Sequence, residues 1–459
     1  MANIFHACDI RGIVGTDLTV EKTREIGLAV GSKLAGKRVI VGGDVRLSTP
    51  ELQPIIVAAL AEAGCDVINV GIVSTPAFYF ALQQLDAEGG VMVTASHNPA
   101  PYNGFKLVLG PQPISEAAIA DIADIVARQD FSSGFGSQSE YPVLADYIEK
   151  TVRKAERSSQ PFKVVVDAGN GAAALTAPIV FTELGYDVVK LFCEIDGSFP
   201  NRPPNPALSE NLAALSAKVI ECGAAAGIAF DGDGDRVGIV DERGNIVAND
   251  HIMVLLARYY LAGQAGTVIY DAKCSMVVPE EIIKAGGRPI MARAGHTFSK
   301  IAFLEEQALF AGEISGHFFF KELGYDDGLF AGIKVCELIA RYGPLSKQVA
   351  TIPKYFLTPD IRVPYQGSDK AEILTAMEEK LAPYTPNRID GVRIEFPDGW
   401  GMMRSSVTEP LFTLRFEATT LLRLQEIEQL FLSALPERLY ETVHTKIVAC
   451  EGFLQERTK

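Results

Sequence analysis

The serine best placed to take part in a reaction in this chain is Ser96. It lies in Thr94-Ala95-Ser96-His97-Asn98-Pro99, directly after the apolar run Val91-Met92-Val93, and Lys106 follows ten residues later. A hydroxyl at the carboxyl end of a buried strand, with an ammonium group nearby, is placed as a phosphoryl carrier would be. Phosphorylated, it would carry about −1.5 to −2 charges and three acceptor oxygens. Taken alone, a Ser-x-Asn-Pro stretch is more often a turn or a helix cap.

A compact acidic loop provides a second chemical feature. Asp231, Asp233 and Asp235 alternate with glycines, and Arg236 follows them. Three carboxylates this close repel one another unless a cation neutralises them, and oxygen-only ligands suit Mg²⁺ or Ca²⁺. An EF-hand is the main rival, but it requires glycine where this chain has Arg236, and the flanking sequence predicts strands. We therefore interpret the loop as a catalytic magnesium site, which together with Ser96, Lys106 and Arg236 indicates phosphoryl transfer.

Two further motifs are ambiguous when each is taken alone. Glu313, Ser315 and His317 form a polar loop bracketed by glycines, in which the first two could bind sugar hydroxyls and His317 could move a proton. A lone histidine, such as His296, is more often structural than catalytic. The segment Arg404 to Pro410 could grip a phosphate through charge-assisted hydrogen bonds, although a solvated turn is commoner. Asp9-Ile10-Arg11-Gly12 is similarly ambiguous.

The elements that would position these residues alternate between strands and helices over roughly the first 350 positions. Strands are predicted near 37–41, 66–70 and 91–94, with helices beginning at Ser48-Thr49-Pro50-Glu51 and Ser74-Thr75-Pro76, where a hydroxyl would cap free amides. The βαβ pattern recurs twice more, which predicts three related α/β units with mixed sheets. Because ligands bind at the carboxyl ends of strands in such sheets, the candidate residues should line one cleft.

The last hundred residues have a different texture. Strict alternation of apolar and polar residues at 392–396 and 411–416 predicts antiparallel strands with one solvated face. This part of the chain is therefore predicted to be a smaller α+β domain.

Composition excludes several classes of partner. The 459 residues include 57 acidic and 42 basic ones, for a formal charge of −15. Such a chain has no general attraction for nucleic acid or anionic membranes, so the cations that bind a phosphorylated substrate must be concentrated locally. No apolar stretch reaches the roughly 18 residues of a membrane span. The seven scattered cysteines contain no C-x-x-C, which is typical of reduced thiols in the cytoplasm.

The motifs in their order along the chain resemble the phosphohexomutase superfamily, and within it the bacterial phosphomannomutase/phosphoglucomutase branch. The resemblance implies three α/β domains, at 1–145, 146–248 and 249–356, and a C-terminal domain at 357–459 with a TATA-binding-protein-like α+β fold, around a central cleft. It implies transfer of phosphate between O1 and O6 of mannose or glucose phosphates through a phosphoserine, with Mg²⁺ as cofactor and a hexose 1,6-bisphosphate as intermediate and activator. The expected partners are hexose phosphates, for a cytoplasmic monomer or weak homodimer.

The resemblance also implies a role for each matching residue. Ser96 would carry the phosphate and join Asp231, Asp233 and Asp235 on the metal. The other catalytic residues would be Arg11, Lys106, Arg236 and His317, with Lys106 and His317 as the candidates for proton transfer. The substrate would be held by Lys273, Gly295, His296, Glu313, Ser315, Arg404, Ser406 and Thr408.

The sequence departs from the family pattern at two positions. Cys8 stands where the family commonly has tyrosine, and Val407 stands where it commonly has asparagine or glycine. Valine offers no side-chain hydrogen bond, so these departures bear on affinity more than on chemistry. Two alternatives are phosphoglucosamine mutase, although Phe105 before Lys106 favours the mannose/glucose branch, and a non-catalytic sugar-phosphate sensor on the same scaffold.

Overall fold

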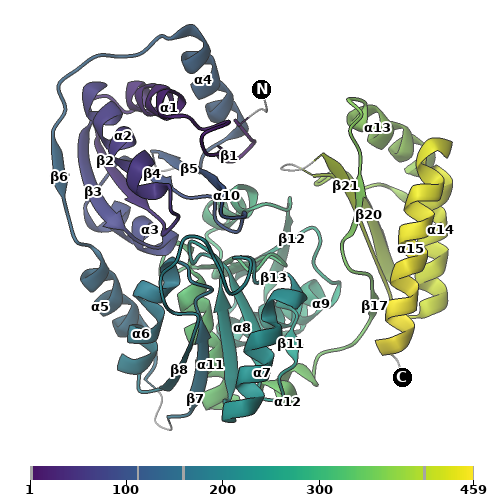
Figure 1. Ribbon diagram of the computed structural model, residues 1–459. Helices are drawn as coiled ribbons and strands as arrows, with labels where there is room; N and C mark the ends of the chain where they lie inside the picture. Colours follow the sequence, from purple (N-terminus) through teal and green to yellow (C-terminus); the bar gives the residue numbers. More distant parts are fainter. Residues whose placement is uncertain (1–3, 111–112, 158–160, 407–409, 458–459) are drawn as a thin grey trace.

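The computed structural model describes residues 4–110, 113–157, 161–406 and 410–457, with side chains described as far as residue 449. The chain forms four sheets with helices packed against them. Figure 1 shows the first three units grouped together, while the C-terminal unit stands to one side with its strands turned toward them. No helix in the described ranges combines the length and apolar character needed to cross a bilayer.

The first unit contains a six-stranded sheet in the order β1-β5-β4-β2-β3-β6. Its elements are β1 (Ile10–Ile13), α1 (Val20–Lys33), β2 (Arg38–Gly43), α2 (Thr49–Glu62), β3 (Asp66–Ile72), α3 (Thr75–Gln84), β4 (Gly89–Val93), β5 (Tyr102–Leu109), α4 (Glu116–Arg128) and β6 (Gln138–Glu140). Strand β4 is buried along its whole length, which explains why its sequence is a continuous apolar run. Strand β6 pairs with β3, so the segment that joins the first two units also supplies an edge strand of the first sheet.

The second unit contains a five-stranded sheet in the order β11-β10-β9-β7-β8. Its elements are α5 (Leu144–Lys154), β7 (Lys163–Asp167), η1 (Ala172–Leu175), α6 (Ala177–Glu183), β8 (Asp187–Leu191), η2 (Ser209–Leu212), α7 (Ala213–Cys222), β9 (Ala226–Phe230), β10 (Val237–Asp241) and β11 (Ile246–Val247). The acidic loop joins β9 to β10, so it lies between two antiparallel strands and has none of the flanking helices of an EF-hand.

The third unit contains a five-stranded sheet in the order β13-β12-β14-β15-β16. Its elements are α8 (Asn249–Leu261), β12 (Thr267–Asp271), α9 (Val277–Lys284), β13 (Arg288–Ala292), α10 (His296–Glu305), β14 (Phe310–Gly312), β15 (Phe318–Phe320), β16 (Tyr325–Asp326), α11 (Gly328–Tyr342) and α12 (Leu345–Val349).

The three units share one topology, as the sequence predicts. In the first unit β2 pairs in parallel with β3 and β4, in the second β7 pairs in parallel with β8 and β9, and in the third β12 pairs in parallel with β13 and β14. The strands β4, β9 and β14 then pair antiparallel with β5, β10 and β15. The repeat is therefore one of architecture: a βαβ pair with one more parallel strand, followed by a hairpin. It places the carboxyl ends of β4, β9 and β14 in equivalent positions.

The C-terminal unit is an antiparallel sheet covered by helices on one face. Its elements are β17 (Phe356–Leu357), β18 (Ile361–Pro364), α13 (Lys370–Leu381), η3 (Ala382–Tyr384), β19 (Val392–Phe396), β20 (Gly399–Ser405), β21 (Leu411–Ala418), α14 (Leu421–Ala434) and α15 (Glu437–Arg457). The predicted fold class, three α/β units and one α+β unit around a cleft, is confirmed.

Two local predictions are wrong. Strand β21 is buried at every position rather than solvated on one face, because the face away from the helices packs against the third unit, where Arg415 donates to the carbonyl oxygen of Lys273 and Glu417 accepts from Ser275 Oγ. Ser74 caps α3 as predicted, but the Ser48 hydroxyl makes no cap on α2. It accepts a hydrogen bond from Asn103 Nδ2 at 2.9 Å instead.

Candidate active site

One cleft of about 1480 Å³ collects residues from all four units. Ser96 follows β4, Arg236 ends the loop after β9, His296 begins the helix after β13, and Glu313 follows β14. These are the carboxyl ends of the strands, where the sequence predicts the ligand edge to be. The structure thus brings together segments that lie far apart in the chain, from Cys8 to Glu417.

Ser96 is fully buried and held in an unusual backbone conformation. Its φ is +48°, a left-handed conformation that costs a residue other than glycine about 1–2 kcal/mol. The amide of Ser96 donates to Thr94 Oγ1 at 2.8 Å, and the Ser96 hydroxyl donates to Asp231 Oδ2 at 2.8 Å. Gly232 permits this approach, because a Cβ there would lie 2.4 Å from the carbonyl oxygen of Ser96. The strain places the Ser96 hydroxyl directly at the acidic loop.

The loop around Ser96 is fixed by Arg46, which the sequence analysis does not single out. The Arg46 guanidinium is buried and donates to four carbonyl oxygens, those of Ser96 at 2.8 Å, Asn98 at 2.7 Å, and Pro99 and Tyr102 at 2.9 Å each. Its charge is balanced by Asp44, 3.2 Å from Arg46 Nε. Asp44 also accepts from Thr94 Oγ1, at 2.6 Å. One arginine therefore sets the shape of the whole Ser96 loop.

Replacing Arg46 with methionine is expected to lower the kcat of the folded variant about 100-fold, because small displacements of a reacting group have effects of that size. Four carbonyls would lose their donor and the Ser96 loop would relax. Steady-state kinetics and thermal unfolding measure the two effects. Arg258→Met is the control, since Arg258 pairs with Glu281 on neighbouring helices of the third unit. A variant that is less stable but keeps wild-type kcat would show that Arg46 only stabilises the fold.

The three aspartates converge as predicted, with ligand oxygens all within 4.8 Å of one another. Asp231 Oδ1 accepts from the amides of Gly234 and Arg236, at 3.0 and 3.1 Å. Asp233 accepts from Lys106 Nζ at 2.6 Å, and Lys106 also donates to Asp235. Burial and the neighbouring carboxylates raise the pKa of Asp231 well above its usual range. The same carboxylates, against the effect of burial, raise the pKa of Lys106.

This acidic cluster suits a hard divalent cation. It offers only oxygen donors, and Asp233 Oδ1 is buried without a hydrogen-bond partner in the described structure. A buried carboxylate oxygen is normally paired, so an orphaned one inside an acidic cluster indicates a ligand atom for a cation. Thr75, at the start of α3, donates to the other oxygen of Asp233 at 2.6 Å. Sequence reasoning places Thr75 only at a helix start.

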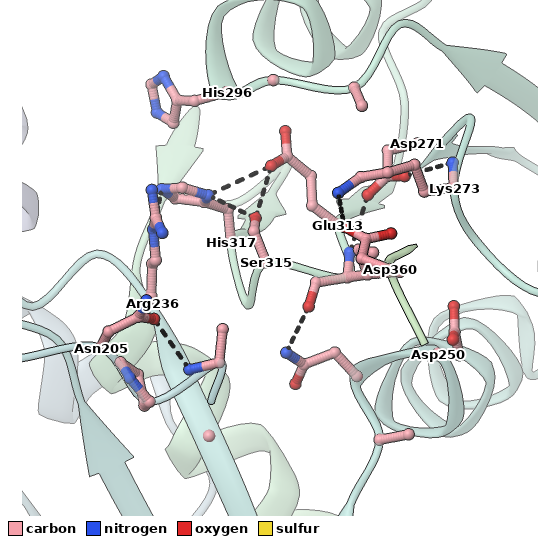
Figure 2. Close-up of a pocket in the computed structure, with 18 of the residues that line it drawn as sticks. Asn205, Arg236, Asp250, Asp271, Lys273, His296, Glu313, Ser315, His317 and Asp360 are labelled. Carbon is pink, nitrogen blue, oxygen red and sulfur yellow. Dashed lines mark hydrogen bonds and ion pairs between the residues drawn. The ribbon is translucent and has the colours of Figure 1, made fainter. Parts of the chain in front are cut away.

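A second group of polar side chains lies next to the aspartates. Figure 2 shows Glu313, Ser315 and His317 pointing toward one another, with Ser315 Oγ 2.7 Å from Glu313 Oε2 and 3.0 Å from His317 Nδ1. His317 Nε2 lies 3.3 Å from Asp235 Oδ1 and from Arg236 Nε. Although burial opposes it, Asp235 raises the pKa of His317 to about 10. Hydrogen bonding and the charge of His317 lower the pKa of Glu313 to about 2, again against burial.

His296 lies beside this group, and Asp326 holds its ring in place. Its Nε2 is 2.9 Å from Asp326 Oδ1, and its ring is 5.0 Å from that of His317 between centroids. Gly295 precedes it with a φ of +134°, which favours glycine. Asp326 is another residue that the sequence does not reveal, because nothing in Tyr325-Asp326 distinguishes a buried carboxylate that pairs with a histidine from one in a turn.

The remaining predicted residues lie at the two ends of the cleft. Arg11 donates to Asn98 Oδ1 at 2.5 Å and pairs with Asp9 beside the Ser96 loop. Lys273 and Arg404 lie at the side of the C-terminal unit, and Ser406 also lines the cleft. Thr408 and Val407 lie outside the described residues. Cys8 lines the cleft near Thr297, and burial raises the pKa of its thiol.

A buried hydroxyl among carboxylates and cations, at the shared edge of repeated α/β sheets, is the arrangement of a phosphoryl-transfer enzyme. Models of the phosphoglucomutase/phosphomannomutase family match the chain throughout: α/β/α domain I at residues 2–133, domain II at 145–244, domain III at 248–355 and the C-terminal domain at 361–434.

Individual relatives agree with the family models. A phosphomannomutase/phosphoglucomutase of Pseudomonas aeruginosa is 40% identical over 443 residues, covering 95% of this chain and 96% of the relative. A phosphoglucomutase of Neisseria gonorrhoeae is 40% identical over 441 residues, covering 94% and 96%. The crystal structure of a phosphoglucomutase/phosphomannomutase family protein from Burkholderia thailandensis superposes with a TM-score of 0.87 at 38% identity, covering 94% and 96%. The chain therefore belongs to the phosphoglucomutase/phosphomannomutase family and is a phosphohexomutase.

Proposed function

We propose that this mutase moves a phosphoryl group between O1 and O6 of mannose and glucose phosphates through a phosphorylated Ser96 and a hexose 1,6-bisphosphate. The observation that carries the proposal is the 2.8 Å hydrogen bond from Ser96 Oγ to Asp231 inside the buried acidic cluster. The choice of sugars is supported by the names of the Pseudomonas and Neisseria relatives. The alternatives of a phosphoglucosamine mutase and of a non-catalytic sensor are not favoured.

The proposed reaction consists of two transfers. In the first, the bond between Ser96 Oγ and phosphorus breaks as phosphorus bonds to the free hydroxyl oxygen of the hexose monophosphate. That hydroxyl loses a proton and Ser96 Oγ gains one, which gives the 1,6-bisphosphate. The bisphosphate reorients, and its other phosphoryl group returns to Ser96 with the opposite proton movements. Phospho-Ser96 is regenerated, and a free hexose 1,6-bisphosphate restores it after accidental hydrolysis.

Lys106 and His317 are the proton-transfer residues of this proposal. Both hold a proton at neutral pH in the ligand-free enzyme, because the carboxylates around them raise the pKa of each. They are therefore ready to protonate Ser96 Oγ as its phosphoryl group leaves. Together with Arg11 and Arg236, they also form the positive lining that a chain with a net charge of −15 needs at this point.

Asp231, Asp233 and Asp235, with an oxygen of phospho-Ser96, are the residues that would hold Mg²⁺. Bound there, Mg²⁺ would neutralise charge on the transferring phosphoryl group. Glu313 and Ser315 would accept from and donate to sugar hydroxyls, beside Gly295 and His296. The non-reacting phosphate would be held by Lys273, Arg404, Ser406 and Thr408. A cytoplasmic location and a monomeric or weakly dimeric state remain part of the proposal. The six cysteines of the described residues are all free, which supports the location.

Coupled assays with the 1-phosphates of mannose, glucose and glucosamine test this proposal, with Mg²⁺ and bisphosphate present. Turnover of the mannose and glucose substrates, with little on glucosamine 1-phosphate, is the expected result. A preference for glucosamine 1-phosphate would move the enzyme to the phosphoglucosamine mutases. Binding of all three without turnover would contradict the catalytic reading of Ser96.

A further inference from the structure

Two cations assigned to the non-reacting phosphate already have carboxylate partners. Lys273 Nζ donates to Asp360 Oδ2 at 2.8 Å, and Arg404 Nε lies 2.6 Å from Asp390 Oδ2. Both pairs lie where the third unit faces the C-terminal unit, and Lys273, Asp360 and Arg404 line the cleft. Figure 2 shows Asp360 beside Lys273. In this structure the phosphate cations are therefore not free to receive an anion.

Carboxylates offset the positive charge in this part of the cleft. Arg415, a third cation, lies 3.4 Å from Asp250, and Asp271 accepts from the backbone amide of Lys273 at 2.7 Å. Lys273, Arg404 and Arg415 thus each have a carboxylate oxygen within 3.4 Å. Because these carboxylates offset the positive charge that attracts a phosphate dianion, the dianion must compete with them for the cations.

Of the two carboxylates, Asp390 is the more firmly held. It also accepts from the amide of Ala294 at 3.2 Å, lies 3.8 Å from Arg293 Nε, and has a side chain only 4% exposed. Its ties to Ala294 connect the C-terminal unit to the residue just before Gly295. Displacing Asp390 would therefore break several contacts at once.

Asp360, in contrast, is placed to be displaced. Its side chain is 26% exposed, and it lies in the connection between β17 and β18 rather than within a strand. Its Oδ1 is buried without a hydrogen-bond partner among the described residues, so the carboxylate is tied down through one oxygen. A phosphate oxygen could replace that single contact with Lys273.

We propose that Asp360 is an internal counter-ion that competes with the non-reacting phosphate for Lys273 and thereby sets the affinity of the subsite. The inference rests on the proposed function, in which Lys273 holds that phosphate. Asp360 neutralises the Lys273 ammonium group until the substrate phosphate binds. When the product phosphate leaves, Asp360 takes its place on Lys273 again and so favours release. Asp360 thus weakens binding of the non-reacting phosphate, whereas a residue that oriented Lys273 toward the phosphate would strengthen it.

Isothermal titration of the purified full chain with inorganic phosphate, at constant ionic strength and pH 8, tests this role. Asp360→Asn is expected to bind phosphate about tenfold more tightly than wild type, since a nearby like charge and a competitor are both removed. In a Lys273→Met background the same change should bring a clearly smaller gain, because the competition for Lys273 is gone and only the loss of the like charge remains. Asp360→Ser serves as a second variant if the asparagine protein unfolds.

The control is Asp369→Asn, which removes a carboxylate of the C-terminal unit paired with Arg438 away from the cleft. It should bind phosphate as wild type does. Equal or weaker phosphate binding by folded Asp360→Asn, or a gain of the same size without Lys273, would overturn the proposal. Because phosphate binding is measured without turnover, these results are independent of whether the enzyme exchanges phosphate between the two hydroxyls of a hexose.

Discussion

Alanine in place of Ser96 is expected to lower turnover of glucose 1-phosphate by at least about 10⁴-fold, the scale seen when a nucleophile is removed. The side chain is the proposed covalent carrier, and no other described hydroxyl donates a hydrogen bond to Asp231. The fold should persist, because the substitution removes one oxygen and Arg46 still holds the loop carbonyls. The measurements are a coupled assay with bisphosphate present, and mass spectrometry of the tryptic peptide for phosphate on residue 96.

Ser433→Ala is the matched control for this change. Ser433 lies on α14, and its hydroxyl donates only to the carbonyl oxygen of Leu430. Its replacement should leave turnover and the phosphopeptide unchanged. A fully active Ser96→Ala enzyme, or phosphate found on a different residue of the working enzyme, would remove Ser96 from the mechanism.

The parts of the site that could be predicted are those set by local sequence and sheet topology. Ser96, Asp231 and Glu313 each follow an apolar strand, and strands of related topology expose their carboxyl ends along one edge. A short-range pattern is enough to place these residues, because each directly follows the strand whose carboxyl end lies at the cleft. For the same reason, the repeated α/β order is visible in the sequence without any knowledge of contacts.

The parts that could not be predicted depend on contacts across long separations in the chain. Arg46 binds backbone carbonyl groups about fifty residues away. Because every residue has such a carbonyl, the sequence does not show which ones an arginine will bind. Asp360 meets Lys273 only because the C-terminal unit docks on the third. The same docking buries strand β21 on both faces, although its alternation resembles that of a half-solvated strand. Strand β20, Gly399–Ser405, has too little alternation to be predicted at all.

Asparagine in place of Asp233 is expected to reduce turnover about 10³-fold, a size typical of losing a main electrostatic contact to a transition state. The variant keeps the shape of the side chain and an acceptor for Thr75 and Lys106, but it removes one of three negative charges from the proposed cation site. Cation affinity should therefore fall. Since a ligand that binds only the native state raises Tm, Mg²⁺ should raise the Tm of chelator-treated wild type and have little effect on that of Asp233→Asn.

The Tm comparison separates metal binding from any other defect of the variant, because it needs no substrate. Asp196→Asn is the control: Asp196 accepts from Ser198 in an exposed turn of the same unit, so Mg²⁺ should raise the Tm of this variant as it does that of wild type. Activity of wild type should vanish on chelation and return when Mg²⁺ is added back. Full turnover in the presence of excess chelator, or an equal response of Tm to Mg²⁺ in wild type and Asp233→Asn, would show that the buried unpaired oxygen of Asp233 has some purpose other than holding a cation.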